Sequence, residues 1–172
     1  MARTSRLWIP VLVGLLVAVV IGPTGGGAVE ASKPRVATAS IVVSAGAFVA
    51  IDSGSAYHNE GFYLAAPSGA SFLAPVVFPV PVVSIRRITL YAFDNSDGGD
   101  ICLSLIRVAM AEVAVRNQVE VCTTGASTVD VQVLDSTAIS PRLVNTALHG
   151  SYLWASIPAG QLLFGVKITY TY

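Results

Sequence analysis

The chain has 172 residues, equal numbers of acidic and basic side chains, and a charged fraction of only 12%. A net charge of zero gives no electrostatic reason to expect a nucleic acid or an anionic membrane as partner. The charged fraction is about half of that in ordinary soluble domains, so we expect a surface that associates with itself or with another envelope protein.

The first thirty or so residues predict an export signal rather than part of the fold. Two arginines precede an uncharged apolar run at 7–21, and a segment rich in glycine follows. This order of basic, apolar and polar segments is typical of a secretory signal. We therefore assign residues 1–31 to a signal peptide, cleaved after Ala28 or Ala31, and expect a secreted, extracellular protein. The alternative is an uncleaved anchor at 7–21, although a spanning helix needs roughly 20 apolar residues.

The remaining segment, 32–172, is long enough for a single domain with a sizeable core. Short stretches rich in β-branched and aromatic residues, separated by Gly, Pro, Asn and Asp, predict a succession of strands. The first strands are expected at 40–51 with a break at Gly46, at 62–66 and at 84–93. The apolar stretch 71–79 contains prolines, so an edge strand or an extended loop is expected there.

The only two cysteines lie near the two ends of one predicted hairpin, residues 101–123. Paired as antiparallel strands about its midpoint, this stretch places Cys102 opposite Cys122 and Ser104 opposite Glu120. The leucines and valines between them then share one face, and the cysteines, Ser104 and Glu120 share the other. Opposed strand residues are close enough for a disulfide, so we predict a Cys102–Cys122 bridge.

The C-terminal part of the chain predicts further strands at 128–135, 152–157 and 162–172. The last two are joined by Pro158, Ala159 and Gly160, which form a typical turn sequence. The stretch 162–172 alternates most regularly, with apolar and aromatic residues at even positions and Gly, Lys or Thr at most odd positions. No window with helical periodicity and helix caps competes with these strands.

About nine short strands with turn signals between them predict an all-β domain, which is either a sandwich or a barrel. Periodicity alone does not separate these two architectures. We expect a single antiparallel β-sandwich with jelly-roll-like connections.

A set of short motifs runs through the same part of the chain. The motifs are SFLAPVVFP at 71–79, ITLYAFDNS at 88–96, ICLSLIRV at 101–108, CTTG at 122–125, YLWASIP at 152–158 and LLFGVKITYTY at 162–172. Between residues 48 and 172 the chain thereby resembles a family of exported bacterial β-sandwich domains of no known activity. Where relatives tend to have Val-Asp-Asn, this chain has Val144, Asn145 and Thr146. The resemblance implies export and a sandwich, and it implies no activity.

One loop concentrates oxygen ligands, and it is the best candidate for a metal site. Asp94, Asn95, Asp97 and Asp100 lie within seven consecutive residues. Calcium takes roughly six to eight oxygen ligands in proteins, so it is the one cofactor that this loop predicts. The spacing does not match the helical calcium-binding loop. The alternative is a solvated hairpin turn, where Asp, Asn and Gly are favoured for their backbone conformations.

No sequence pattern predicts an active site. His58 and His149 lie in polar loop segments, and the cysteines are better used in the bridge than as zinc ligands. His58 with Glu60 and Asp52 is a candidate acid–base cluster, but such residues are more often exposed loop side chains. The chain has no Gly-x-Ser-x-Gly elbow and no phosphate-binding glycine loop. We therefore predict no catalytic residues and no enzymatic activity.

Aromatic side chains offer a binding route that needs no catalysis. Tyr57, Phe62 and Tyr63 flank one polar loop, which also contains the ligand-binding candidate His58. Trp154 is the only tryptophan outside the predicted signal. Such rings can serve as stacking platforms for sugars when polar groups lie beside them. In the middle of a strand, however, a large ring usually fills the core. A glycan-binding role therefore requires that Trp154 is exposed.

The adjacent arginines, Arg86 and Arg87, predict no common patch. Neighbouring residues of a strand point to opposite faces, so we expect the two guanidinium groups to lie on different sides of the sheet. Arg107 is expected to pair with a carboxylate or to lie along the surface at a strand end rather than to bind ligand.

The main functional prediction is a secreted, non-catalytic structural or interaction module of the cell envelope or medium, stabilised by one disulfide. The apolar segment 72–83 motivates the further hypothesis that this region is a self-association surface. The first alternative is a carbohydrate-binding module, and the second is a calcium-binding β-domain.

Overall fold

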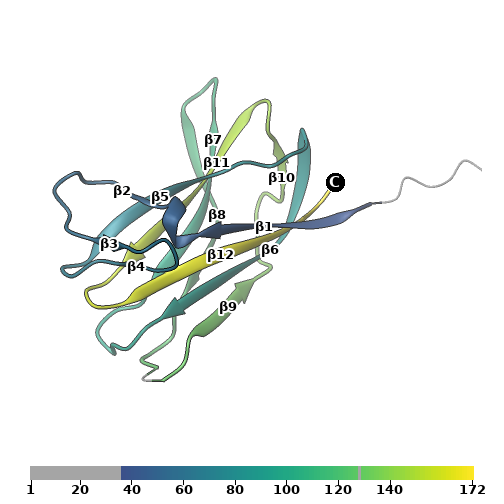
Figure 1. The fold of residues 1–172 in the computed structure, drawn as a ribbon. Coiled ribbons are helices and arrows are strands. Elements are labelled where there is room, and N and C mark those ends of the chain that lie inside the picture. Colours follow the sequence, from purple (N-terminus) through teal and green to yellow (C-terminus); the bar gives the residue numbers. More distant parts are fainter. Residues whose placement is uncertain (1–35, 128) are drawn as a thin grey trace, which may run out of the picture. The chain divides into compact units, whose positions relative to one another are not determined.

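The computed structural model describes residues 36–127 and 129–172, whose strands form two antiparallel sheets (Figure 1). The predicted signal peptide or anchor lies outside these residues. The described residues form one compact unit. Within the described ranges, no helix is both long and apolar enough to cross a membrane.

The first sheet has seven strands, with β6 and β12 side by side at its centre (Figure 1). The strands are β1 (Thr38–Ser44), β3 (His58–Asn59), β4 (Leu64–Ala65), β6 (Val82–Phe93), β9 (Gln132–Ser136), β10 (Leu143–Asn145) and β12 (Leu162–Thr171). Strands β9 and β10 pair with the outer edge of β6, and β1 and β4 pair with the outer edge of β12. Strand β3 continues the sheet beyond β4.

The second sheet has five strands in the order β2, β5, β11, β7, β8. Their bounds are β2 (Val49–Ala50), β5 (Ala70–Val76), β7 (Cys102–Ala109), β8 (Ala114–Cys122) and β11 (His149–Ile157). A short 3-10 turn, η1 (Ala45–Ala47), connects β1 to β2 at the break predicted near Gly46. Strand β5 has only the two-residue β2 on one side, so the proline-containing stretch lies close to a sheet edge, as expected.

The connections are those of a jelly roll. The strands of five or more residues follow the order β1-β12-β6-β9 in one sheet and β5-β11-β7-β8 in the other. Apart from the β7–β8 hairpin, consecutive strands of this set therefore cross between the sheets, in the interlocked pattern of two Greek keys. The predicted antiparallel sandwich with jelly-roll-like connections is confirmed.

Alternating side chains of both sheets fill one core. The largest fully buried side chains include Phe48, Leu64, Phe72, Ile85, Ile88, Leu90, Ile101, Leu103, Leu105, Leu153, Ile157 and Leu163. Burial of each such side chain stabilises the fold by roughly 1.5–3 kcal/mol. The core therefore outweighs a single disulfide bridge, which contributes about 3 kcal/mol for a loop of this length. The alternate side chains of each strand lie on the outer face of its sheet.

A β-bulge in β12 breaks the alternation predicted for 162–172. The pairing with β6 shifts between Leu163 and Gly165, so Leu163 is fully buried while Phe164 is only partly buried. From Val166 to Thr171 the predicted alternation holds, with Val166, Ile168 and Tyr170 buried. At the bulge, a Cβ on Gly165 would lie 2.9 Å from the Val43 carbonyl oxygen, so only glycine allows β1 to approach this closely.

A second bulge lies in β6 and corrects the expectation for the two arginines. Tyr170 pairs with Ile85 and Thr169 pairs with Arg87, which leaves Arg86 as the extra residue. Ile85 and Ile88 are both buried, and the two arginines between them are both exposed. The expectation that Arg86 and Arg87 point to opposite faces is therefore wrong, because a bulge adds one residue without crossing the sheet.

The apolar segment 72–83 is divided between buried and exposed residues. Its buried members are Phe72, Ala74, Val76, Phe78 and Val83. Val77 and Val82 are exposed, but the buried Phe78 and the half-buried Val80 lie between them, so the segment has no long uninterrupted run of exposed apolar residues. The structure therefore gives that hypothesis no support.

Candidate functional site

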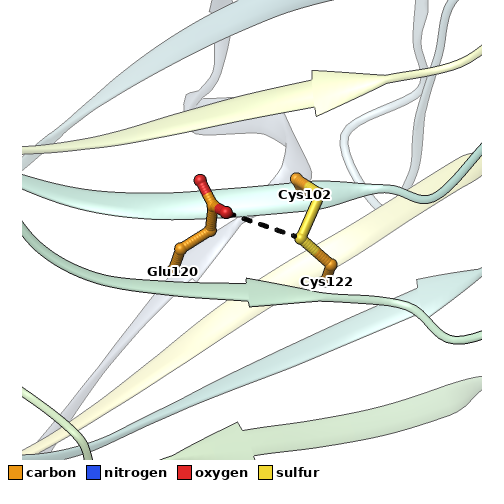
Figure 2. Close-up of side chains that lie close together, drawn as sticks. All are labelled: Cys102, Glu120 and Cys122. Carbon is orange, nitrogen blue, oxygen red and sulfur yellow. Dashed lines mark hydrogen bonds between the residues drawn. A yellow bond between two sulfur atoms is a disulfide. The ribbon is translucent and has the colours of Figure 1, made fainter.

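The cysteine hairpin sets the register of polar side chains on the outer face of the second sheet. Cys102 pairs with Cys122 and Ser104 pairs with Glu120, as predicted. The disulfide is formed, and its Cα atoms are 4.1 Å apart, which indicates a closely spaced, non-hydrogen-bonded pair. Figure 2 shows the Glu120 side chain lying beside the bridge. The bridge therefore fixes the position of Glu120 on β8.

A small hydrogen-bond network orients the Glu120 carboxylate. Ser104 Oγ donates to Glu120 Oε2 at 3.1 Å, and Asn117 Nδ2 donates to Ser104 Oγ at 3.3 Å. Glu120 Oε1 lies 3.9 Å from Cys122 Sγ. A disulfide sulfur carries no hydrogen, so we interpret this as a close contact rather than a hydrogen bond. The carboxylate is thus held in place while one of its oxygens keeps its acceptor capacity.

Glu120 and the two cysteines of the bridge do not make a metal site. Among the described residues, Cys102, Glu120 and Cys122 form the one group of three or more His, Cys, Asp or Glu whose ligand atoms lie within 4.8 Å of one another. Zinc binds cysteine as thiolate, and both sulfurs are consumed by the bridge. A single carboxylate remains, which is too few ligands for a structural metal.

Trp154 lies next to this network on the neighbouring strand. It pairs with Ser104 of β7 on one side and with Leu73 of β5 on the other. Leu153 and Ala155 are buried, so alternation directs the indole outward, where it is 41% exposed. The expectation that so large a ring fills the core is wrong.

The indole and the carboxylate network line one hollow of about 240 Å³, which we call the Trp154 hollow. Its lining residues are Cys102, Ser104 and Ile106 of β7, Val115, Asn117 and Glu120 of β8, and Trp154 and Ser156 of β11. All of them are carried by adjacent paired strands rather than by loops, which gives a binding surface little freedom to move.

Two larger hollows differ from it in chemistry. One of about 600 Å³ lies at the tip of the β7–β8 hairpin, with Met110 and Leu148 among its lining residues. The other, of about 450 Å³, lies on the outer face of the first sheet. Neither combines an exposed indole with an oriented carboxylate, so volume alone does not select the candidate site.

The other residues predicted to bind ligand lie apart from Trp154. The Tyr57 ring packs edge-on against Phe72, with centroids 5.4 Å apart, and Phe72 belongs to the core. Tyr57 therefore approaches the second sheet from its inner side, whereas Trp154 leaves it on the outer side. His58 lies in β3 at an edge of the first sheet, and Tyr63 follows it in the adjoining loop. The structure does not bring these four side chains into one site.

The acidic loop is organised by hydrogen bonds of its own. Asp94 is fully buried, and its Oδ1 accepts a hydrogen bond from the Ser96 backbone N–H at 3.1 Å. Its other oxygen accepts from the Thr123 hydroxyl. Asp94, Asp97 and Asp100 form no compact group of ligand atoms among the described residues. The loop connects β6 of the first sheet to β7 of the second, so the hairpin-turn alternative is wrong, and the calcium site remains a prediction.

The histidines also lie apart. His58 is in the first sheet, and His149 begins β11 in the second. The His149 Nδ1 atom lies 3.0 Å from the Asn145 carbonyl oxygen, which fixes its ring. Within the described residues, neither histidine joins two carboxylates in a compact group, so the candidate cluster of His58, Glu60 and Asp52 is not assembled.

Sequence reasoning missed Asn117 as a partner in the site, and it did not connect Glu120 to Trp154. The predicted hairpin register did place Ser104 and Glu120 on one face. That β11 lies against β7 follows from the jelly-roll order, which no local pattern reveals. An outward residue on β11 was therefore not identifiable as a neighbour.

Comparisons of the sequence with known proteins find no match. No protein-family model matches the chain, and no curated protein matches it significantly.

Comparisons of the structure find distant likenesses. The C-terminal CBM6 of LamC, a marine laminarinase from Zobellia galactanivorans, has a TM-score of 0.47 at 15% identity, covering 76% of this chain and 99% of that one. The xylan-binding module CBM15 has a TM-score of 0.48 at 15% identity, covering 77% and 97%. The structure of infectious bursal disease virus strain Gx has a TM-score of 0.39 at 8% identity, covering 80% and 32%. These values are too low to carry an argument about function.

Proposed function

We propose that the protein is a carbohydrate-binding module that holds a sugar against Trp154 on the outer face of its second sheet. The observation that carries this proposal is the exposure of the indole beside an oriented carboxylate. A sugar ring has an apolar face of C–H groups and a rim of hydroxyls. An aromatic ring with polar groups at its edge complements both.

Each side chain of the Trp154 hollow has a distinct role. Trp154 is the stacking platform. Glu120 accepts hydrogen bonds from sugar hydroxyls, and a charged acceptor makes such bonds stronger than a neutral one. Asn117 keeps Ser104 and Glu120 aligned. The carboxylate also disfavours a negatively charged sugar at this hollow, so the preferred ligand is neutral.

The expected affinity is modest. The hollow is small, with a volume of about 240 Å³, and offers one aromatic platform, and association costs several kcal/mol before any contact shows as affinity. A Kd of about 0.1–1 mM for a short oligosaccharide is in keeping with such a site. Export through the predicted signal at 1–31 brings the protein to extracellular polysaccharide.

Affinity electrophoresis tests the proposal with a panel of neutral polysaccharides, including xylan, mannan, galactan, laminarin and cellulose derivatives. At least one of them should retard the purified protein, and Trp154→Ala should abolish the retardation. The matched control is Phe62→Ala, which removes another exposed aromatic ring from a loop outside the Trp154 hollow. Retention of full binding by Trp154→Ala, or retardation by no polysaccharide, contradicts the proposal.

The interaction module remains a second candidate because of one observation. Met110 and Leu148, both exposed, line the hollow at the tip of the β7–β8 hairpin. Exposed apolar side chains that line a hollow are typical of a protein–protein contact. Light scattering of the purified protein and of Met110→Ser checks this candidate. A strict monomer at high concentration in both proteins removes self-association as its basis.

A further inference from the structure

Three of the six basic side chains of the described residues line one hollow. The six basic side chains, against nine acidic ones, are Arg86, Arg87, Arg107, Arg116, Arg142 and Lys167. Arg86, Arg87 and Lys167 all line the hollow of about 450 Å³ on the outer face of the first sheet, which we call the basic hollow. Only one carboxylate, Asp135, lines it with them. An otherwise acidic domain therefore carries a local excess of positive charge.

The bulge in β6 creates this concentration. Without it, one of the two neighbouring arginines would point into the core. Arg87 Nε lies 3.4 Å from Asp135 Oδ2, the only ion pair in the described part of the chain. Arg86 Nε donates to Thr171 Oγ1 at 3.0 Å, and a hydroxyl leaves its positive charge uncompensated. Lys167 lies across the sheet from Asp135, with Thr89 of β6 between them.

Two uncompensated cations on one face repel each other, and the intramolecular contacts do not remove this cost. An external anion bound between the two cations removes this repulsion. Guanidinium groups bind planar carboxylates through two parallel hydrogen bonds, and a lysine adds a point charge. The hollow also presents hydroxyls of Thr137 and Thr169. A ligand that carries both carboxylate and hydroxyl groups satisfies this lining.

We infer that the basic hollow is a second binding site, independent of the Trp154 hollow, for a polysaccharide that contains uronic acid residues. Its volume lies within the roughly 300–1,000 Å³ of small-ligand sites, which suits one or two sugar rings. A nucleic acid requires a longer run of phosphate contacts than three cations provide, and the acidic excess of the domain repels so dense a polyanion. A uronic acid polymer carries one charge on each sugar.

Isothermal titration of the purified protein with sodium polygalacturonate tests this inference, with dextran as the neutral polymer. We expect binding of polygalacturonate that weakens with salt, and no binding of dextran at this site. The variant Arg86→Gln/Lys167→Gln should raise the Kd for polygalacturonate at least about tenfold. Both side chains are exposed, and the thermal unfolding of each variant verifies that it is folded.

The matched control removes the same charge elsewhere. Arg107→Gln/Arg116→Gln takes two arginines from the second sheet and should leave the Kd within about twofold. Trp154→Ala should also leave it unchanged, so failure of the proposed function does not affect this test. The inference is overturned if polygalacturonate does not bind, or if both double variants weaken it equally. Tighter binding of DNA or anionic vesicles through Arg86 and Lys167 also overturns it.

Discussion

The two outer faces of the sandwich are built on the same core, yet they carry opposite chemistry. The face of the first sheet presents Arg86, Arg87 and Lys167, with one carboxylate among them. The face of the second sheet presents Trp154 and Glu120, with no basic side chain lining its hollow. A net charge of zero therefore describes the average of the chain and neither of its faces.

The two faces also differ in what fixes them. A β-bulge brings the arginines together on one face, whereas a disulfide beside Glu120 holds the register of the other. The inward-facing side chains of each strand pack in the core, so only the outward-facing side chains can contact a ligand. The comparison teaches that register, more than composition, decides what each face can bind.

The largest expected effect comes from the core that both faces share. Leu105→Ala removes a fully buried side chain of β7 and should lower the free energy of unfolding by about 2–5 kcal/mol. Ile106→Ala, the next residue on the same strand, points outward and should cost less than half as much. Urea unfolding of both variants measures this difference. Equal losses would mean that the assigned inner face of β7 is wrong.

Removal of the disulfide bridge should affect ligand binding at one face of the sandwich and not at the other. Cys102→Ala/Cys122→Ala should lower stability by about 3 kcal/mol, because it releases a constraint on the unfolded chain. It should also weaken neutral-sugar binding at the Trp154 hollow while leaving polygalacturonate binding unchanged under conditions where the protein is folded. Thermal unfolding and titration with each ligand check both parts. Equal weakening for the two ligands contradicts the independence of the faces.

The smallest expected effect is the most specific to one face. Glu120→Gln keeps the shape of the side chain but loses its charge, so neutral-sugar affinity should fall about five- to tenfold. Stability should change by less than about 0.5 kcal/mol because Glu120 is exposed. Affinity electrophoresis beside thermal unfolding gives both values. An unchanged sugar affinity removes Glu120 from the site.

The sequence predicts the jelly roll and the first four pairs of one hairpin, from Cys102–Cys122 to Leu105–Val119, and a bulge shifts the pairing beyond Leu105. Alternation and a pair of cysteines agree on the pairing of Cys102 with Cys122, so two independent signals fix it. Bulges are different, because one extra residue leaves no pattern that separates it from regular alternation. The exposed pair Arg86 and Arg87 and the buried Leu163 were missed for this reason.

Periodicity also does not tell which face is inward. The stretch 128–135 alternates valine with polar residues, yet Leu134 packs toward the core and Val133 is exposed. Pairing of β9 with β6 decides this orientation. Likewise, Trp154 meets Ser104 and Glu120 only because β11 lies beside β7, and strand order in a sandwich is set by long-range packing.

The most direct test follows the emission of Trp154 during titration with the neutral oligosaccharide that corresponds to the best-retained polysaccharide. The variant Trp8→Phe leaves Trp154 as the only tryptophan of the full chain. The account predicts that acrylamide quenches this indole, that the sugar changes its emission in a saturable manner and protects it from the quencher, and that Lys167→Gln behaves identically. Emission that no sugar alters, from an indole that acrylamide still reaches, would contradict the account.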